Sequence, residues 1–258
     1  MHPHVNIALR AARDAADAIV HASDRLDRIK IIDQHPDSFL TSMDQEADDT
    51  IRYHLQKTFP SHSIHSRVSG HHAGENGEPT WLIDPLVGNH NFSSGHPQFA
   101  VSIANATGGV VKHAVLLSPL LREEFIASRG DGALLNSRRI RVADHKDLEH
   151  SLISIDQAKT SEELFISLMQ ILLKSGAELR QSGCSPFDIV QVAAGRLSGG
   201  WCMFPNSLSL AAANLVLAEA GGLIGNESGS PDLDKGRELI FGNPKIFKEL
   251  IRIRRKVN

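Results

Sequence analysis

The side chains with the widest chemical range in this chain are its histidines. There are 14 of them among 258 residues, and His65, His71, His72 and His90 lie close together along the sequence. Imidazole is a common ligand of Zn²⁺ and other transition metals, so a transition-metal site is one interpretation. Because His71 and His72 stand in a glycine-bounded stretch, we favour solvated loop histidines.

The two cysteines are placed neither for cross-linking nor for catalysis. Cys184 and Cys202 form no CxxC motif and have no zinc-ligand spacing,. Such sparse cysteine usage is typical of a reducing cytosol. No base can be assigned to Cys202, so we expect a small buried residue there and not a nucleophile.

The overall charge gives no strong attraction to nucleic acid or to a membrane. The formal net charge is −3, and the one basic run, residues 252–256, is interpreted as the end of a helix. The longest apolar stretch, Leu208–Ile224, is interrupted by Ser209, Asn214 and Glu219 and is too short to span a bilayer,. The first residues do not resemble a secretory signal. We therefore expect a cytoplasmic protein without a membrane segment.

The first 150 residues are predicted to be an α+β half. Apolar residues at helical spacing predict helices over residues 4–27 and 43–58, separated by a turn-rich segment over Asp33–Ser38,. Runs rich in β-branched residues between Gly-rich or polar breaks predict short strands over residues 63–66, 80–83, 98–104, 109–117 and 124–127,.

Residues 151–258 are predicted to be an α/β half, in which strands and helices alternate. The expected strands cover residues 151–155, 200–204 and 238–241, and the expected helices cover residues 161–174, 185–194, 207–220 and 244–256,. This order of elements suggests sheets layered between helices.

One block of sequence resembles a known family. Residues 80–92, Thr80-Trp81-Leu82-Ile83-Asp84-Pro85-Leu86-Val87-Gly88-Asn89-His90-Asn91-Phe92, resemble the signature WxIDPxDGTxNF of the inositol monophosphatases. Further blocks agree in order and spacing: residues 38–44, 59–64, 130–142, 192–196 and 219–222. The resemblance covers roughly residues 5–250 and looks closest to the bacterial SuhB-type members. It implies a layered αβαβα sugar-phosphatase fold, formed by residues 1–258 as a single domain.

The resemblance also implies a Mg²⁺ site that this chain has largely lost. Family members hydrolyse phosphomonoesters with Mg²⁺ held by carboxylates and one carbonyl. The position of the first ligand Glu is Arg67, and the two aspartates of IDPxD correspond to Asp84 and Val87. The carbonyl position is Leu86, and the Asp of a late WD pair corresponds to Ser209.

Other positions of the family's site are partly kept. Asp44, which helps to orient the attacking water in the family, is present, but its Thr partner corresponds to Asn89. A substrate-binding Glu corresponds to Cys202. The Glu that neighbours the ligand Glu corresponds to Val68, and a Lys corresponds to Asp33.

Residues Gly88-Asn89-His90 match the family's phosphate-binding turn, where backbone N–H groups face the anion,. Anion binding of this kind does not depend on side chains and could persist without catalysis. A plain helix start is the alternative.

These correspondences imply a binding or regulatory pseudoenzyme. A cation 4 Å from a divalent ion costs on the order of 8 kcal/mol at an effective dielectric constant near 20, so we expect no metal cofactor and expect Arg67 to point at Asp84 and Asp44. An Arg67 in solvent is the alternative. The family resemblance implies a homodimer that associates with transcription antitermination or RNA-processing proteins. The alternative function is an active Mg²⁺-dependent inositol-phosphate phosphatase with an altered metal site.

Overall fold

The computed structural model describes residues 2–35, 38–156, 162–203, 206–233 and 236–257. Within these residues, an eight-stranded sheet is the larger of two main sheets, and a two-stranded hairpin forms a third. The strand order of the eight-stranded sheet is β10-β9-β8-β7-β6-β5-β3-β4, and only the β3–β5 pair is parallel. The strands are β3 (Ser63–Ser66), β4 (Gly70–His72), β5 (Thr80–Val87), β6 (Ala100–Thr107), β7 (Val110–Ser118), β8 (Glu123–Ser128), β9 (Gly132–Leu135) and β10 (Arg138–Ile140).

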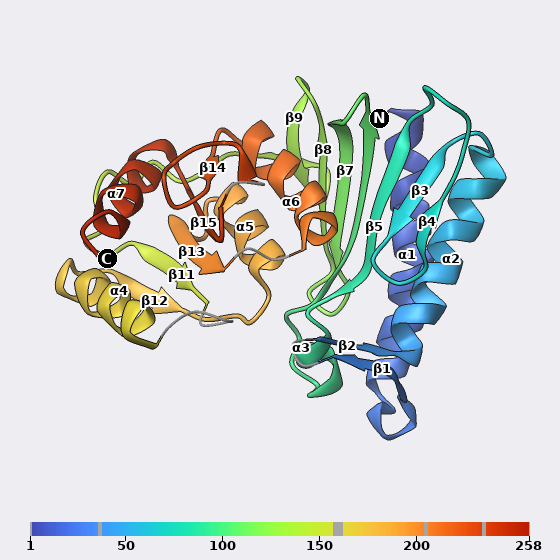
Figure 1. Ribbon diagram of the computed structural model, residues 1–258, viewed down its shortest axis with the longest axis horizontal. Helices are drawn as coiled ribbons and strands as arrows, with labels where there is room; N and C mark the ends of the chain where they lie inside the picture. The colour runs from blue at the N-terminus through green and yellow to red at the C-terminus, as the bar shows by residue number, and fades with distance from the viewer. Residues whose placement is uncertain (1, 36–37, 157–161, 204–205, 234–235, 258) are drawn as a thin grey trace.

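Two long helices cover one face of this sheet (Figure 1). Helix α1 (Pro3–Ser23) lies against β6 and β7, and α2 (Ser42–Thr58) lies against α1 and β5. The buried face of α1 is rich in alanine, which lets the helix approach its neighbours closely,. Large side chains such as Trp81 and Ile83 fill the space beneath the helices.

The second sheet has the strand order β12-β11-β13-β15-β14. Its strands are β11 (Leu152–Ile155), β12 (Glu178–Arg180), β13 (Gly199–Met203), β14 (Leu223–Gly225) and β15 (Glu238–Gly242). Strand β11 is parallel to both of its neighbours, whereas β15 is antiparallel to β13 and β14.

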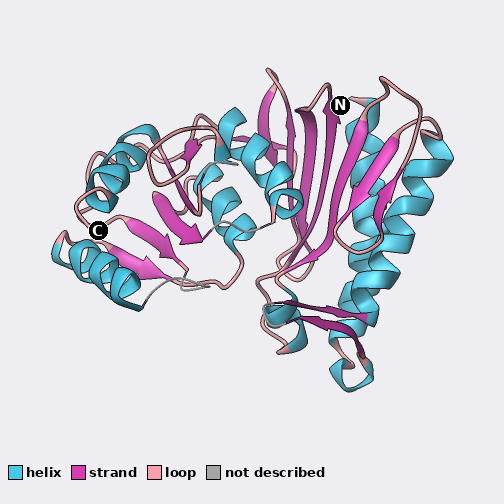
Figure 2. Cartoon of the chain, in the orientation of Figure 1, coloured by secondary structure: helices cyan, strands magenta, loops and turns pink. Residues whose placement is uncertain are grey.

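Helices α5 (Ser185–Ala193) and α6 (Ser207–Glu219) lie between the two sheets, and α4 (Glu162–Lys174) and α7 (Pro244–Arg254) pack on the far side of the second sheet (Figures 1 and 2). Helix α6 is apolar all round, as a helix between two sheets must be,. The layers therefore run α-β-α-β-α, which confirms the fold expected from the sequence. The contacts of α6 with both sheets support our proposal that the chain forms a single domain.

The turn-rich interpretation of residues 33–38 is wrong for Asp33, Gln34, His35 and Ser38, which lie in strands. Strands β1 (Ile31–His35) and β2 (Ser38–Thr41) form an antiparallel hairpin, with residues 36–37 outside the described part. Hydrogen bonding between the backbones of β1 and β2 outweighs the low strand propensity of the polar residues in this segment. The first helix also ends earlier than expected, at Ser23, and a short 3₁₀ helix, η1 (Leu26–Arg28), follows it.

Short strands account for most of the other differences. Strands β4, β9, β10, β12 and β14 are three or four residues long and were not predicted, because so few residues show no clear alternation. His71 and His72 consequently lie in β4 and not in a loop. Strand β5 continues through Pro85 to Val87, since its ladder is irregular between Asp84 and Val87 and tolerates a proline there,.

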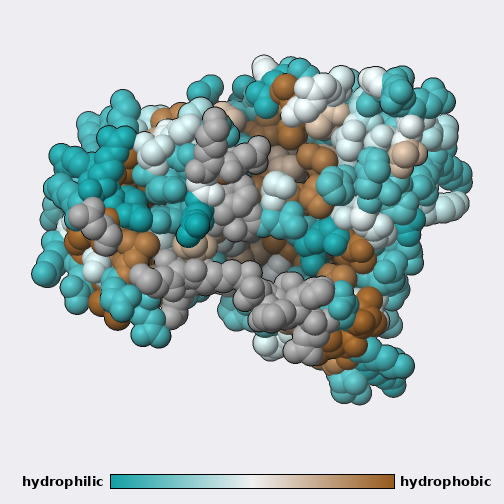
Figure 3. Space-filling view, in the orientation of Figure 1, coloured by the Kyte–Doolittle hydropathy of each residue, from teal (hydrophilic) through white to brown (hydrophobic). Residues whose placement is uncertain are grey.

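The basic residues near the C-terminus lie where the charge pattern of the sequence predicted. Arg252 and Arg254 lie in the last turn of α7 and form ion pairs with Glu249 and Glu238, which confirms the helix-end interpretation. Within the described residues, the helices are too short or too polar to cross a bilayer. Figure 3 shows hydrophobic surface over the β1–β2 hairpin, where Ile31 is exposed.

Candidate active site

Arg67 is positioned by the end of β3, which runs parallel to β5. Ser66, the last residue of β3, donates its hydroxyl hydrogen to buried Asp48 of α2. The same hydroxyl oxygen accepts a hydrogen bond from the Val68 N–H at 3.0 Å and so shapes the turn. The Arg67 N–H donates to the Ile83 carbonyl at 2.9 Å. The backbone of Arg67 is therefore fixed beside β5.

Asp44 is held by the start of α2. It forms a capping box with Thr41, whose N–H and hydroxyl donate to Asp44 Oδ2 at 2.8 and 2.7 Å,. The other oxygen, Oδ1, accepts from the Asn89 side chain at 2.6 Å. The helix start thus fixes a fully buried carboxylate at the carboxyl end of β5.

Asp84 is held by groups from two separate parts of the chain. Its Oδ1 accepts from the Leu86 N–H at 3.3 Å, where the ladder of β5 becomes irregular. Its Oδ2 accepts from the hydroxyl of Ser209 in the first turn of α6. Residues 84 and 209 come together because α6 packs against β5 and β6.

The guanidinium group of Arg67 lies between the two carboxylates. Its Nε donates to Asp84 Oδ1 at 2.7 Å, and its Nη2 donates to Asp44 Oδ1 at 2.6 Å and to the Leu86 carbonyl at 3.2 Å. The Arg67 side chain is only 15% exposed. The prediction that Arg67 points at Asp84 and Asp44 is confirmed, and the solvent-facing alternative is wrong.

The electrostatics of this group are those of a buried cation shared by two anions. Burial alone would lower the pKa of Arg67, but the charges of Asp84 and Asp44 raise it, so the guanidinium stays protonated. Burial raises the pKa of Asp44, while Arg67 and the hydrogen bonds from Thr41 lower it. Arg67 is therefore the group that makes an ionised Asp44 tolerable at this depth.

Val87 and Cys202 are both packing residues. Val87 contacts Cys184 and Phe187 in a small buried cluster. Cys202 lies in β13 of the second sheet, 1% exposed, within the core between the sheets. Burial raises the pKa of the Cys184 and Cys202 thiols, so neither is a ready nucleophile,.

The Gly88–His90 turn has a backbone that only glycine fits well. Gly88 has φ = 88°, and a Cβ atom there would lie 3.1 Å from the Gln98 carbonyl oxygen and 3.3 Å from Cys184 Sγ,. Gly88 is the N-cap residue of the short helix α3 (Asn89–Ser93). The His90 ring packs edge-on against Phe39 at 4.7 Å between centroids. Anion binding at this turn stays a proposal.

Among the described residues, His65, His71, His72 and His90 do not form a group that could hold a metal ion. His65 and His71 are in ring contact across β3 and β4, at 6.0 Å, and His72 Nε2 is hydrogen-bonded to Ser69. In the described part of the chain, the three residues whose side chains lie close enough together to hold a metal ion are instead His2, His4 and His113. The signal of this group in the sequence is His2-Pro3-His4, two imidazoles at close spacing.

Sequence reasoning also missed a buried carboxyl group, Asp188 in α5. Its Oδ2 accepts from the Ser154 hydroxyl at 2.5 Å, and burial raises its pKa to about 6. Asp188 lines a cavity of about 520 Å³, which Gln98 and Ser182 also line. The Asn91 side chain of α3 donates to the carbonyls of both these residues, so α3 is hydrogen-bonded to two residues of the cavity wall.

Comparison with known proteins places the chain in a family. The model of the inositol monophosphatase family matches residues 1–258. A protein named Nus factor SuhB from Pseudomonas aeruginosa is 39% identical, covering 97% of this chain and 95% of the relative. The Nus factor SuhB of Escherichia coli is 33% identical, with coverages of 97% and 95%.

Solved structures agree. The extragenic suppressor protein suhB from Bartonella henselae superposes with a TM-score of 0.95 at 28% identity, covering 99% of both chains. An IMPase from Thermotoga maritima gives a TM-score of 0.89 at 26% identity, covering 99% of this chain and 98% of its own.

The chain therefore belongs to the inositol monophosphatase family. Within that family it is of the SuhB type.

Proposed function

We propose that this chain is a binding protein of the transcription machinery that no longer hydrolyses phosphomonoesters with Mg²⁺. The observation that carries the loss of hydrolysis is the Arg67 guanidinium between Asp44 and Asp84. The partner class is supported by similar proteins, which bear the name Nus factor.

The donor set does not fit Mg²⁺. This ion takes oxygen ligands in near-octahedral geometry at about 2.0–2.1 Å. Asp44 Oδ1, Asp84 Oδ1 and the Leu86 carbonyl all accept hydrogen bonds from Arg67. Val87 offers no ligand atom, and the Ser209 hydroxyl is already used as a donor to Asp84. The guanidinium supplies the positive charge that the two carboxylates require, so a divalent ion would have to displace it.

Two further properties belong to the same proposal. A scaffold kept over the whole chain without its metal chemistry favours a binding role in the cytoplasm, as a homodimer of the kind that the family resemblance implies. Exposed apolar residues such as Ile31 on the β1–β2 hairpin offer a surface that a partner could cover,. The Gly88–His90 turn could still bind an anion through its backbone N–H groups.

The hydrolysis part is tested by Mg²⁺ titration with inositol 1-phosphate and a generic phosphomonoester. Turnover is expected to be at background, since several losses at one metal site compound. A double variant, Arg67→Glu with Ser209→Asp, restores two carboxylates and is expected to gain a Mg²⁺-dependent rise in melting temperature that the natural chain does not show. Robust turnover by the natural chain, abolished by Asp84→Ala, would show that the alternative, an active phosphatase with an altered metal site, is correct.

The binding part is tested by affinity purification from the native cell. Transcription proteins are expected to co-purify, and an Asp84→Asn variant shown to be folded is expected to recover the same set, because binding does not need hydrolysis. Recovery of nothing above a bait-free control, together with a deletion strain of unchanged growth, would overturn this part.

A further inference from the structure

A cluster of three histidines lies where the first turn of α1 meets the eight-stranded sheet. His2 precedes α1, His4 is in its first turn and His113 is in β7. One ring nitrogen of each lies within 4.8 Å of the others. The ring centroids of His2 and His113 are 4.0 Å apart, and that of His4 is 4.9 and 5.4 Å from them.

The backbone holds two of these side chains firmly. His4 follows Pro3, which fixes the first turn of α1, and the helix is anchored on the sheet by buried Val5,. His113 pairs with Ser128 of β8, and its Nδ1 is hydrogen-bonded to the Ser128 hydroxyl at 2.9 Å. When Nδ1 donates this hydrogen, Nε2 carries the lone pair that can bind a metal ion, as in many metal-ligating histidines.

The surroundings favour neutral imidazoles, the form that binds metal. Burial and the neighbouring His2 and His4 lower the pKa of His113 to about 4; Lys112 acts in the same direction and Asp131 against it. Burial, His2 and His62 lower the pKa of His4. Among the described residues, the buried Nδ1 of His4 has no hydrogen-bond partner.

We propose that His2, His4 and His113 bind a divalent transition-metal ion of the Zn²⁺ type. Three imidazoles are a known ligand set for Zn²⁺ and leave a fourth, open position for water or a small anion. His2 caps α1, because its Nδ1 accepts a hydrogen bond from the His4 N–H at 3.3 Å. The His2 side chain is exposed, so a small rotation of its ring could aim the other nitrogen, Nε2, at the ion.

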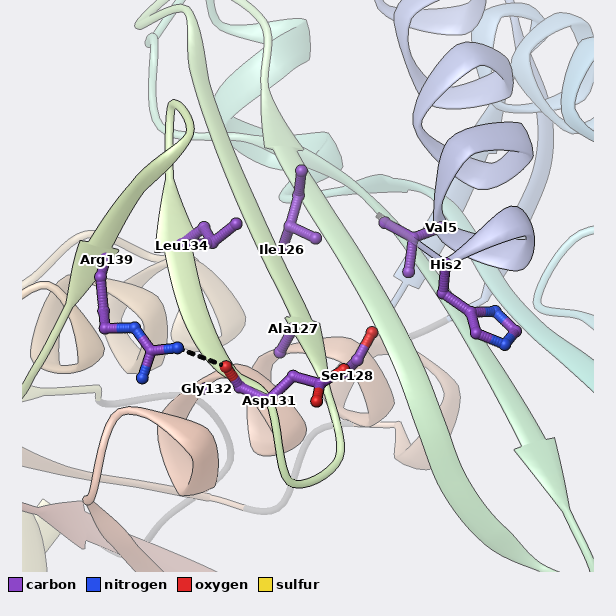
Figure 4. A pocket seen from close by; sticks show the side chains of 9 residues that line it. All are labelled: His2, Val5, Ile126, Ala127, Ser128, Asp131, Gly132, Leu134 and Arg139. Atoms are coloured by element: carbon purple, nitrogen blue, oxygen red, sulfur yellow. Dashed lines mark hydrogen bonds between the residues drawn. The ribbon is translucent and has the colours of Figure 1, made fainter.

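Of the three histidines, His2 lines a cavity of about 310 Å³, and so does Ser128, the hydrogen-bond partner of His113 (Figure 4). Its other lining residues include Asp131 and, on the opposite side, Arg139, whose Nη2 donates to the Asp131 carbonyl at 2.8 Å. If the His2 ring turned toward this cavity, a water molecule or small anion bound to the ion would have room there. The ion itself would tie the start of α1 to β7 and so stiffen the first residues of the chain.

The competing explanation is plain aromatic packing. His4 also contacts the rings of Phe59, His62 and Trp81, and a stack of neutral rings is favourable without a metal. The two explanations differ in whether all three imidazoles are needed for metal affinity.

The test is a Zn²⁺ titration of the full chain, purified without a polyhistidine tag, by calorimetry. One ion per chain is expected. His113→Ala and His2→Asn are each expected to weaken binding at least tenfold. The second variant keeps a side chain that can cap α1, so it should fold even if the first does not. His65→Ala removes an imidazole from the same sheet outside the cluster and is the matched control, expected to bind as the natural chain does.

Hydrogen exchange gives an independent readout. Zn²⁺ is expected to slow exchange in the first turns of α1 in the natural chain and in His65→Ala, but not in His2→Asn. Absence of Zn²⁺ binding at millimolar concentration, or binding unchanged in both His113→Ala and His2→Asn, would overturn the proposal. Neither readout involves Mg²⁺ or phosphate ester hydrolysis, so the result is independent of the proposed function.

Discussion

Replacing Arg67 by methionine should destabilise the protein far more than a typical loss of an arginine. Three hydrogen bonds would be lost, to Asp84, Asp44 and the Leu86 carbonyl. Two carboxylates whose side chains are 2% exposed or less would lose their cation. Removal of one partner of a buried ion pair costs about 3–5 kcal/mol, so we expect the free energy of unfolding to fall by about that amount.

The loss should depend on pH in a definite direction. Burial raises the pKa of Asp44 above its ordinary 3.8, and Arg67 opposes this rise. Without Arg67 the pKa of Asp44 in the folded protein rises further, so above pH 3.8 the folded state binds more protons than the unfolded state. Stability then falls as pH rises. The effect of Arg67→Met is therefore expected to be larger at pH 7.5 than at pH 5.

Urea unfolding followed by circular dichroism at the two pH values measures this. Arg13→Met is the matched control: Arg13 forms an ion pair with Glu124, but its side chain is 55% exposed, and the expected loss is about 1 kcal/mol or less. Equal, small losses for both variants, or a larger loss at pH 5 than at pH 7.5, would refute the assignment of Arg67 as a buried internal cation.

Three further predictions concern Gly88, Asp188 and the oligomeric state. Gly88→Ala should lower the free energy of unfolding by about 1–3 kcal/mol, because φ is +88° and a Cβ atom would crowd the Gln98 carbonyl,; an unchanged denaturation midpoint would contradict this. The pKa of Asp188 is raised to about 6, so the folded state holds the extra proton between about pH 4 and 6 and stability falls as pH rises through that window. Asp188→Asn should remove this dependence and gain about 2–3 kcal/mol relative to the natural chain above pH 6; parallel stability–pH curves for the two proteins would speak against it. Light scattering should give twice the 28.1 kDa mass of one chain, and a single-chain mass throughout the micromolar range would count against the homodimer.

The sequence was most informative where structure is local. Helix α2 was expected over residues 43–58 and is observed as Ser42–Thr58, and α5 and α6 were also placed to within a residue or two. Helical periodicity and end signals act over a few residues, so they can be read without the fold. The short edge strands and the β1–β2 hairpin were missed, because their existence depends on a partner strand elsewhere in the chain.

For the candidate site, the sequence by itself determined which side chains are present: an arginine where a ligand Glu is expected, with Val87 and Ser209 at two further ligand positions. Only the tertiary structure decided where these side chains point. Arg67 meets Asp84 and Asp44, 17 and 23 residues away, because β3 runs beside β5 and α2 begins at the end of that strand.

The histidine cluster also separates what the sequence determines from what the tertiary structure decides. The sequence contains His2-Pro3-His4, but nothing local connects these residues with His113. They meet because apolar burial packs the alanine-rich face of α1 across β7,. Local sequence determines the types of the ligating groups, whereas the packing of a helix on a sheet, a long-range effect, determines which of them come together.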